Sequence, residues 1–171
     1  MRAKNMALCG MFSALLAACA WLSFPIGDVA ITLQTFGILL CLRVLGGKRG
    51  TIAIFVYLLL GAVGLPVFSG FRGGLGVLLG ATGGYLTGFL LTGLLYWLLT
   101  ALSPKYTLPA MVIGLLICYC VGSIWYYHIY TGNAATAGFI LIKCVLPYLL
   151  PDGVKLFLAY RLGEKLKGFV Y

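Results

Sequence analysis

The sequence predicts an all-α integral membrane protein, a six-transmembrane-helix bundle with an outward-facing substrate pocket. Hydrophobic residues make up 63% of the chain, charged residues only 9%, and the mean hydropathy is +1.09. These values lie far outside the range of soluble domains. A helical span needs about 20 apolar residues, so 171 residues accommodate about six spans and short loops. No room remains for a soluble catalytic domain, and we expect a single membrane domain over residues 1–171.

Proline, glycine and basic residues mark the ends of the expected spans. The first span ends at a Phe-Pro-Ile-Gly sequence, the second and third are separated by the basic sequence Gly-Gly-Lys-Arg-Gly, and the fourth and fifth by Ser-Pro-Lys-Tyr-Thr. The expected spans are residues 6–24, 31–46, 50–66, 82–102, 108–130 and 151–167, with a possible short outer helix over residues 134–147.

The region of residues 134–167 is either one kinked span or a short outer helix followed by a span. Pro151 favours the second arrangement, because proline fixes φ and disfavours a helical conformation at the preceding Leu150. We therefore expect a helix to begin with Pro151 at its first position. Asp152 would then lie in the first turn, near the positive end of the helix dipole.

Basic residues predict the orientation in the membrane. With the N-terminus in the cytoplasm, most of them fall on the cytoplasmic side, and only Arg72 lies in a clearly outer loop. Both termini are therefore expected on the cytoplasmic side of the cytoplasmic membrane, with Asp28 on the outer side. The net charge of +9 is spread over short connections, which disfavours nucleic acid as a partner. The nine inner residues are Arg2, Lys4, Arg43, Lys48, Arg49, Lys105, Arg161, Lys165 and Lys167.

Asp152 and Lys155 are the strongest candidates for a functional site. Asp152 is one of three acidic residues and lies among apolar residues, a costly setting for a carboxylate in a membrane. The i, i+3 spacing places Lys155 on the same helix face. The pair is either a polar ligand site or a local ion pair that stabilises a kinked helix.

Two further segments could contribute to a pocket. Seven glycines between residues 70 and 84 allow positive φ values and exposed N–H groups, which can bind an anion such as a carboxylate together with Arg72. Thr32, Gln34 and Thr35 at the start of the second span are either capping groups or pocket residues. Gly80, Gly84 and Gly88 recur every four residues, and close helix packing is their expected role.

Enzyme chemistry finds little support in the chain. No phosphate-binding G-x-x-x-x-G-K-[ST] sequence occurs, so ATP hydrolysis is not expected. The six cysteines form no C-x-x-C pair, and the single histidine, His128, has no carboxylate nearby in sequence. We expect no metal, no cofactor and no catalytic residues.

A row of small residues runs along the first span. Gly10, Ala14 and Ala18 recur every four residues, as do Ser13 and Ala17, which makes one face nearly flat. Such a face serves either packing within the bundle or docking of a partner subunit, and the pattern alone does not decide between them.

Four motifs, in this order, resemble the BioY family, the biotin-specific S components of energy-coupling-factor transporters. They are Ala-Ile-Thr-Leu-Gln-Thr at 30–35, Gly-Leu-Pro-Val-Phe at 64–68, the glycine-rich stretch at 73–85, and residues 147–155. The resemblance extends over essentially the whole chain. It implies a six-helix bundle that binds biotin and has no ATPase of its own.

The resemblance also implies partners and site residues. Uptake would require a transmembrane coupling subunit and two cytoplasmic ATPase subunits, docked on a stripe that maps to Ala14 and Ala18, with Gly10 on the same row. Asp152 and Lys155 match the contacts to the ureido ring. The full set of expected substrate-binding residues is Asp152, Lys155, Gln34, Thr35, Arg72, Gly73, Gly74, Thr82 and Tyr85.

Three other functions are considered. An S component for another vitamin is the nearest alternative. A structural membrane subunit would use Asp152 and Lys155 for stability alone. A membrane-embedded enzyme is disfavoured, since three acids and one histidine provide no identifiable nucleophile and base.

Overall fold

Helices overlap all six expected spans in the computed structural model of the chain, which describes residues 3–24, 30–130 and 136–170. The expectations for Arg2 and Asp28 lie outside these residues. In chain order the elements are α1 Ala3–Trp21, β1 Ser23–Phe24, β2 Ile31–Thr32, α2 Gln34–Leu45, α3 Gly47–Ala62, α4 Leu75–Leu78, α5 Gly83–Leu102, the 3₁₀ turn η1 Pro104–Tyr106, α6 Thr107–Trp125, the π-helical turn η2 Tyr126–Tyr130, α7 Ala137–Cys144 and α8 Leu146–Val170.

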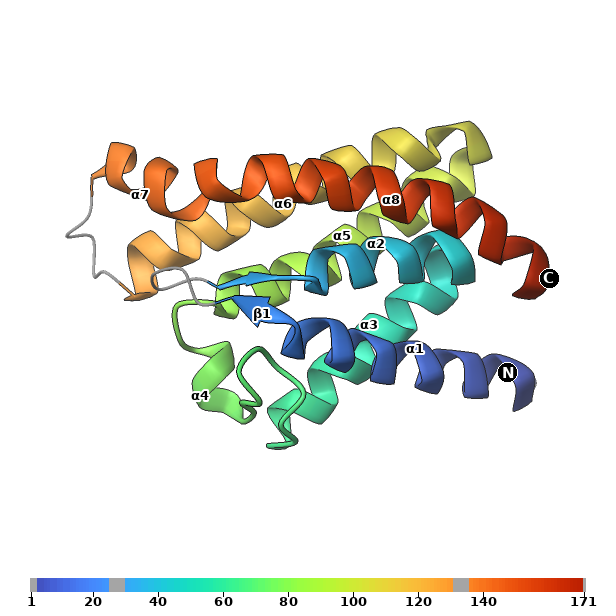
Figure 1. Ribbon diagram of the computed structural model, residues 1–171, viewed down its shortest axis with the longest axis horizontal. Coiled ribbons are helices and arrows are strands. Elements are labelled where there is room, and N and C mark those ends of the chain that lie inside the picture. Colours follow the sequence, from blue (N-terminus) through green and yellow to red (C-terminus); the bar gives the residue numbers. More distant parts are fainter. Residues whose placement is uncertain (1–2, 25–29, 131–135, 171) are drawn as a thin grey trace.

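The long helices run side by side along one direction of an elongated bundle (Figure 1). Both termini lie at one end, and the two strands, α4 and α7 lie at the other (Figure 1). α5 packs along α6, α2 along α8, and α1 against α2 and α3. By length and composition, three helical segments of the described part of the chain could cross a membrane: Ala3–Trp21, Gly83–Leu102 and Pro104–Ile129.

Glycine allows α5 and α6 to approach closely. A Cβ atom on Gly84 would lie 2.8 Å from Cγ of Trp125, and one on Gly88 would lie 3.0 Å from Cα of Cys118. The packing role expected for these two glycines is therefore confirmed. Gly80 lies before α5, where a Cβ atom would meet only backbone oxygens of the preceding turn, so the same expectation is wrong for Gly80.

The expected helix start at Pro151 is wrong, because α8 already begins at Leu146 and contains Pro151. The interruption lies at Val145, whose carbonyl accepts hydrogen bonds from the N–H groups of Tyr148 (3.0 Å) and Leu149 (3.2 Å) in the first turn of α8. Pro147 lies in that turn, where a missing N–H costs nothing. Pro151 forfeits one bond to the carbonyl four residues earlier. Asp152 consequently lies in the second turn, away from the helix start.

Two short strands replace the ends of the first two expected spans. Ser23 pairs with Thr32 and Phe24 with Ile31 in an antiparallel ladder. This pairing delays the start of α2 to Gln34, whose backbone N–H donates to the Thr32 hydroxyl at 3.1 Å. The Thr32 hydroxyl thus accepts one N–H of the first turn, although the residue at the N-cap position is Leu33, whose side chain makes no capping bond.

A charged contact joins α2 to α8 near the termini. Arg43, 8% exposed, forms an ion pair with Glu164, and its guanidinium lies 5.3 Å from the centre of the Tyr160 ring. Gly163 makes room for the arginine stem, since a Cβ atom there would lie 2.7 Å from Cβ of Arg43.

Replacing Gly163 by alanine is expected to destabilise the protein by about 1–3 kcal/mol, the usual cost of overpacking. The near end of the Arg43 side chain cannot rotate away as its tip could. Gly153→Ala in the same helix is the matched control, because a Cβ atom there meets nothing within 4 Å. Thermal unfolding of both purified variants measures the difference, and equal midpoints would contradict the expectation.

Candidate functional site

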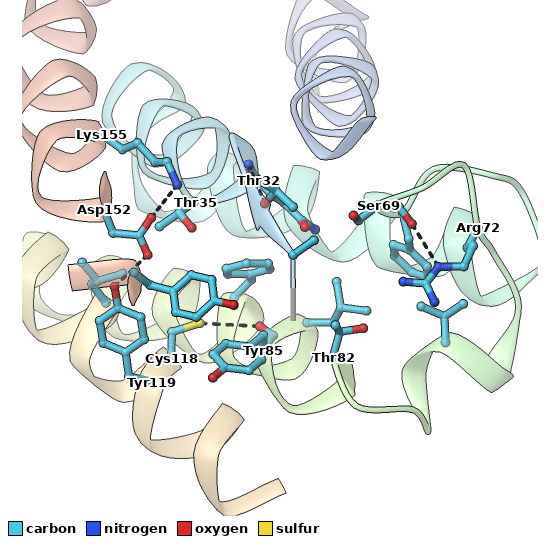
Figure 2. Close-up of a pocket in the computed structure, with 18 residues that line it drawn as sticks. Thr32, Thr35, Ser69, Arg72, Thr82, Tyr85, Cys118, Tyr119, Asp152 and Lys155 are labelled. Carbon is cyan, nitrogen blue, oxygen red and sulfur yellow. Dashed lines mark hydrogen bonds and ion pairs between the residues drawn. The ribbon is translucent and has the colours of Figure 1, made fainter. Parts of the chain in front are cut away.

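A cavity lies between α2, the loop before α4, α5, α6 and α8 (Figure 2). Its volume of about 60 Å³ exceeds the roughly 10–15 Å³ that one water molecule needs. Seven of the nine expected substrate-binding residues line it, and Gly73 and Gly74 do not. The lining residues are Ala30, Thr32, Gln34, Thr35, Phe68, Ser69, Arg72, Val77, Thr82, Tyr85, Leu86, Phe89, Leu115, Cys118, Tyr119, Tyr148, Asp152 and Lys155.

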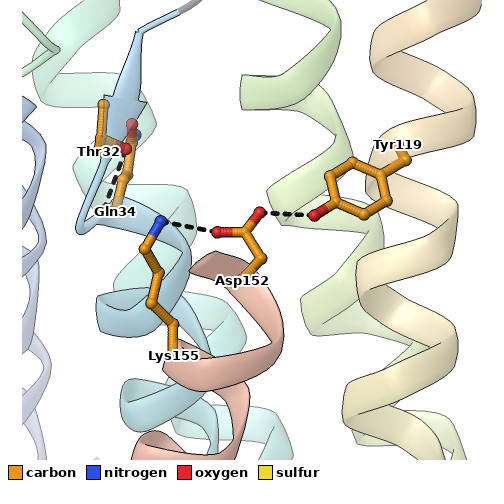
Figure 3. Close-up of polar contacts among 5 residues, drawn as sticks. All are labelled: Thr32, Gln34, Tyr119, Asp152 and Lys155. Atoms are coloured by element: carbon orange, nitrogen blue, oxygen red, sulfur yellow. Dashed lines mark hydrogen bonds and ion pairs between the residues drawn. The ribbon is translucent and has the colours of Figure 1, made fainter. Parts of the chain in front are cut away.

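Asp152, Lys155 and Tyr119 form a buried polar centre on one wall (Figure 3). Asp152 is 4% exposed and Lys155 8%. The ammonium of Lys155 donates to Oδ1 of Asp152 at 2.7 Å, and the hydroxyl of Tyr119 donates to Oδ2, also at 2.7 Å. Opposite charge and two hydrogen bonds therefore offset the cost of burying this carboxylate.

The polar centre retains capacity for a ligand. A carboxylate offers about four lone-pair positions, and the two contacts to Asp152 use one on each oxygen. An ammonium has three donors, of which the bond to Asp152 uses one. The centre can therefore accept N–H groups and donate to an oxygen at the same time.

Gln34 and Thr35 contribute from the start of α2. The side-chain amide of Gln34, which is 5% exposed, donates to the Tyr57 hydroxyl at 2.8 Å, and that hydroxyl donates to the Val67 carbonyl at 3.1 Å. Gln34 thus both lines the cavity and connects α2 through α3 to the loop before α4. Of the two roles considered for this segment, lining a cavity is the one that Thr32, Gln34 and Thr35 share.

The loop of residues 64–74 brings Phe68, Ser69 and Arg72 to the cavity. The backbone N–H of Phe68 donates to the Arg72 carbonyl at 2.9 Å, which closes a tight turn. Nε of Arg72 donates to the Ser69 carbonyl at 3.2 Å, and Figure 2 shows the guanidinium on the side of the cavity remote from Asp152. The Arg72 cation therefore lies at the other end of the cavity from the polar centre.

Gly73 and Gly74 lie outside the cavity lining and have backbone roles in the loop. The N–H of Gly74 donates to the Gly61 carbonyl at 2.7 Å, and its φ of 93° requires glycine. A Cβ atom on Gly73 would lie 2.7 Å from the carbonyl carbon of Leu65. The sequence cannot separate a glycine that exposes an N–H group from one that admits a neighbouring backbone.

Thr82 and Tyr85 line the cavity from the start of α5. The carbonyl of Thr82 accepts from the N–H of Tyr85 at 3.1 Å, in the first turn of the helix. The Tyr85 hydroxyl donates to the carbonyl of Cys144, the last residue of α7, at 2.8 Å. Tyr85 therefore also fixes the end of α7 beside the cavity.

Sequence reasoning missed Tyr119, the third member of the polar centre. Its partner Asp152 lies 33 residues further along the chain, and no local pattern connects them. The available signal is a tyrosine in the middle of an apolar span, away from the aromatic cluster at 125–130 where an interfacial belt is expected.

The small-residue rows of α1 divide between two faces. Ser13 and Ala17 are buried, and the Ser13 hydroxyl donates to the Ala53 carbonyl of α3 at 2.8 Å. Gly10 and Ala14 are exposed and Ala18 is half-buried. The row of Ser13 and Ala17 thus serves packing within the bundle, while the row expected for docking faces outward.

Comparisons with known proteins agree on one family. The model of the BioY family matches residues 1–170. The biotin transporter BioY of Thermotoga maritima is 40% identical over 163 residues, covering 92% of each chain. The probable biotin transporter BioY of Pyrococcus horikoshii is 39% identical over 168 residues, covering 98% of this chain and 99% of that protein.

A solved structure supports the same assignment. The crystal structure of the S-component for biotin from an ECF-type ABC transporter superposes with a TM-score of 0.84 at 28% identity, covering 96% of this chain and 91% of that chain. The match thus includes the sequence, the fold and nearly the full length of the chain. On this basis the chain belongs to the BioY family.

Proposed function

We propose that this chain is a substrate-capture subunit that binds biotin and mediates its uptake across the cytoplasmic membrane together with an ATP-driven energy-coupling module. The observation that carries the proposal is the buried centre of Asp152, Lys155 and Tyr119 at one end of a cavity otherwise lined mainly by apolar and aromatic side chains. Relatives named as biotin transporters support the choice of ligand.

Biotin suits this distribution of polar groups. Its ureido ring carries two N–H donors and one carbonyl acceptor, so Asp152 would accept from the ring and Lys155 would donate to its oxygen. Phe68, Phe89 and Tyr148 also line the cavity and would contact the apolar part of the ligand. The carboxylate tail would then lie toward the Arg72 guanidinium.

The orientation belongs to the same proposal. We expect six spans, both termini in the cytoplasm and a cavity that opens outward. The placement of both termini at the end opposite α4 supports an even number of crossings (Figure 1). The partners would be a transmembrane coupling subunit, which docks on Gly10, Ala14 and Ala18, and two cytoplasmic ATPase subunits.

Calorimetric titration of the purified chain with biotin tests the proposal. Saturable binding at one site per chain is the expected result. A panel of other vitamins in the same assay identifies an S component of different specificity, if one of them binds and biotin does not. A folded protein that binds none of them would leave a structural membrane subunit and overturn the proposal.

A further inference from the structure

The loop of residues 64–74 contains an unusual backbone conformation. Phe71 has a φ of 56°, and among the residues that the structure describes it is the only one other than glycine with a positive φ. The neighbouring Gly70 also has a positive φ, 71°. A left-handed conformation is unfavourable for a residue with a side chain and persists only where the surroundings hold it. Contacts outside the turn must therefore stabilise this part of the loop.

Trp21, the last residue of α1, provides such contacts. Its ring stacks on Phe71 with the centres 5.0 Å apart and the planes 24° from parallel. Its indole N–H donates to the carbonyl of Pro66 at 2.8 Å. One side chain thus holds the loop both before and after Phe68.

The loop is attached at a second, inner point. Phe68 is 1% exposed and occupies the space left by Gly61, where a Cβ atom would overlap its ring. Tyr57 packs edge-on against it with the ring centres 5.6 Å apart. This anchor is buried in the core, whereas Trp21 is 40% and Phe71 64% exposed. The outer attachment is therefore the one that can open without disrupting the core.

The two attachments act on the residues that line the cavity. Ser69 and Arg72, both on the cavity wall, lie in the same turn as Phe71, which the bond between Phe68 and Arg72 closes. The outer attachment belongs to α1, the helix whose exposed row contains Gly10 and Ala14. A shift of α1 relative to α3 would therefore move the loop and with it one wall of the cavity.

We propose that Trp21 is a positioning residue that holds the 64–74 loop against the cavity. Its contacts with Phe71 and Pro66, the outer attachment, form a clasp, and ligand exchange requires this clasp to open. The proposal rests on the proposed function for its ligand. The contact itself can be tested without any ligand.

The kinetic test compares Trp21→Ala and Trp21→Phe with the wild type by stopped-flow measurement of biotin association and dissociation. Loss of one ring stack and one hydrogen bond is expected to speed dissociation about tenfold. Association should also accelerate, because both directions pass through the open clasp, so the Kd changes less than the dissociation rate. Trp21→Phe keeps a ring for stacking and should recover part of the effect. Trp97→Ala, at an equally exposed tryptophan of α5, is the matched control and should leave both rates unchanged.

Phe71→Ala removes the ring stack but leaves the hydrogen bond to Pro66, so it should show part of the effect of Trp21→Ala. The double variant should add little to Trp21→Ala, since that variant has already lost the stack. Additive effects, or rates in Trp21→Ala equal to those of the control, would overturn the proposal. Hydrogen exchange of the amides of residues 67–72 without ligand separates the two hypotheses. Faster exchange in Trp21→Ala is expected even if biotin does not bind, and unchanged exchange would refute the clasp. Failure of the wild type to bind biotin would refute only the proposed function.

Discussion

Replacing Asp152 by asparagine is expected to weaken biotin binding by about two to three orders of magnitude. The carboxylate accepts from both Lys155 and Tyr119. An amide has only one acceptor oxygen, so its NH₂ group would face one of these donors or the N–H groups of the ligand. Removing one partner of a buried, hydrogen-bonded charge pair costs about 3–4 kcal/mol, which corresponds to that loss of affinity.

The control for this prediction is Glu164→Gln, which neutralises an exposed acid in the same helix outside the cavity. It should leave the Kd of biotin unchanged. Tyr119→Phe removes a single hydrogen bond and no charge, and about a tenfold loss is expected. This variant keeps the test available if Asp152→Asn does not fold. Calorimetry on folded variants measures all three affinities, and a Kd within about threefold of the wild type for Asp152→Asn would contradict the ureido contact.

Replacing Ala14 by tryptophan is expected to abolish co-purification with the coupling and ATPase subunits while biotin binding persists. Ala14 is exposed on α1 and lies outside the cavity. Helices in a membrane approach closely where small residues meet, and a large side chain there holds them apart. The expected loss is complete, because on the proposed function the partner would contact the backbone along this face.

Leu15→Trp provides a matched control one residue further along, about 100° around the helix from Ala14. Leu15 is also exposed, so both substitutions place a large ring outside the bundle. Affinity purification of each variant co-expressed with its partners compares the two. Retention of the partners by Ala14→Trp, or equal loss with Leu15→Trp, would show that the row Gly10, Ala14 and Ala18 is not the docking face.

Local sequence patterns predicted where the long helices lie, because apolar composition is a property of each segment alone. They failed where a distant contact decides the outcome. The helix start at Pro151 was predicted from proline geometry alone. The loss of one hydrogen bond is tolerated, because the helix begins at Leu146 and packs along α2. Pairing of Ser23 with Thr32 likewise required knowledge that the two segments meet.

The candidate site divides in the same way. Asp152 and Lys155 were found because their spacing of three residues is local and their charge is rare in this chain. Tyr119 was not predicted, because only the packing of α6 near α8 brings its hydroxyl to the Asp152 carboxylate. Gly73 and Gly74 were assigned to the ligand from composition, whereas the structure uses both for close backbone contacts within the protein.

Two polar contacts at different positions along the axis of α8 prevent this helix from sliding along that axis. Asp152 is bonded to Tyr119 of α6, and Glu164, twelve residues further on, is paired with Arg43 of α2. At 1.5 Å per residue these points lie about 18 Å apart along the helix axis. Sliding α8 by one turn, about 5.4 Å, would break both contacts at once. We therefore expect α8 to keep its position during each cycle of loading and release. The displacement that empties the cavity should then take place in elements on the side of the cavity opposite α8.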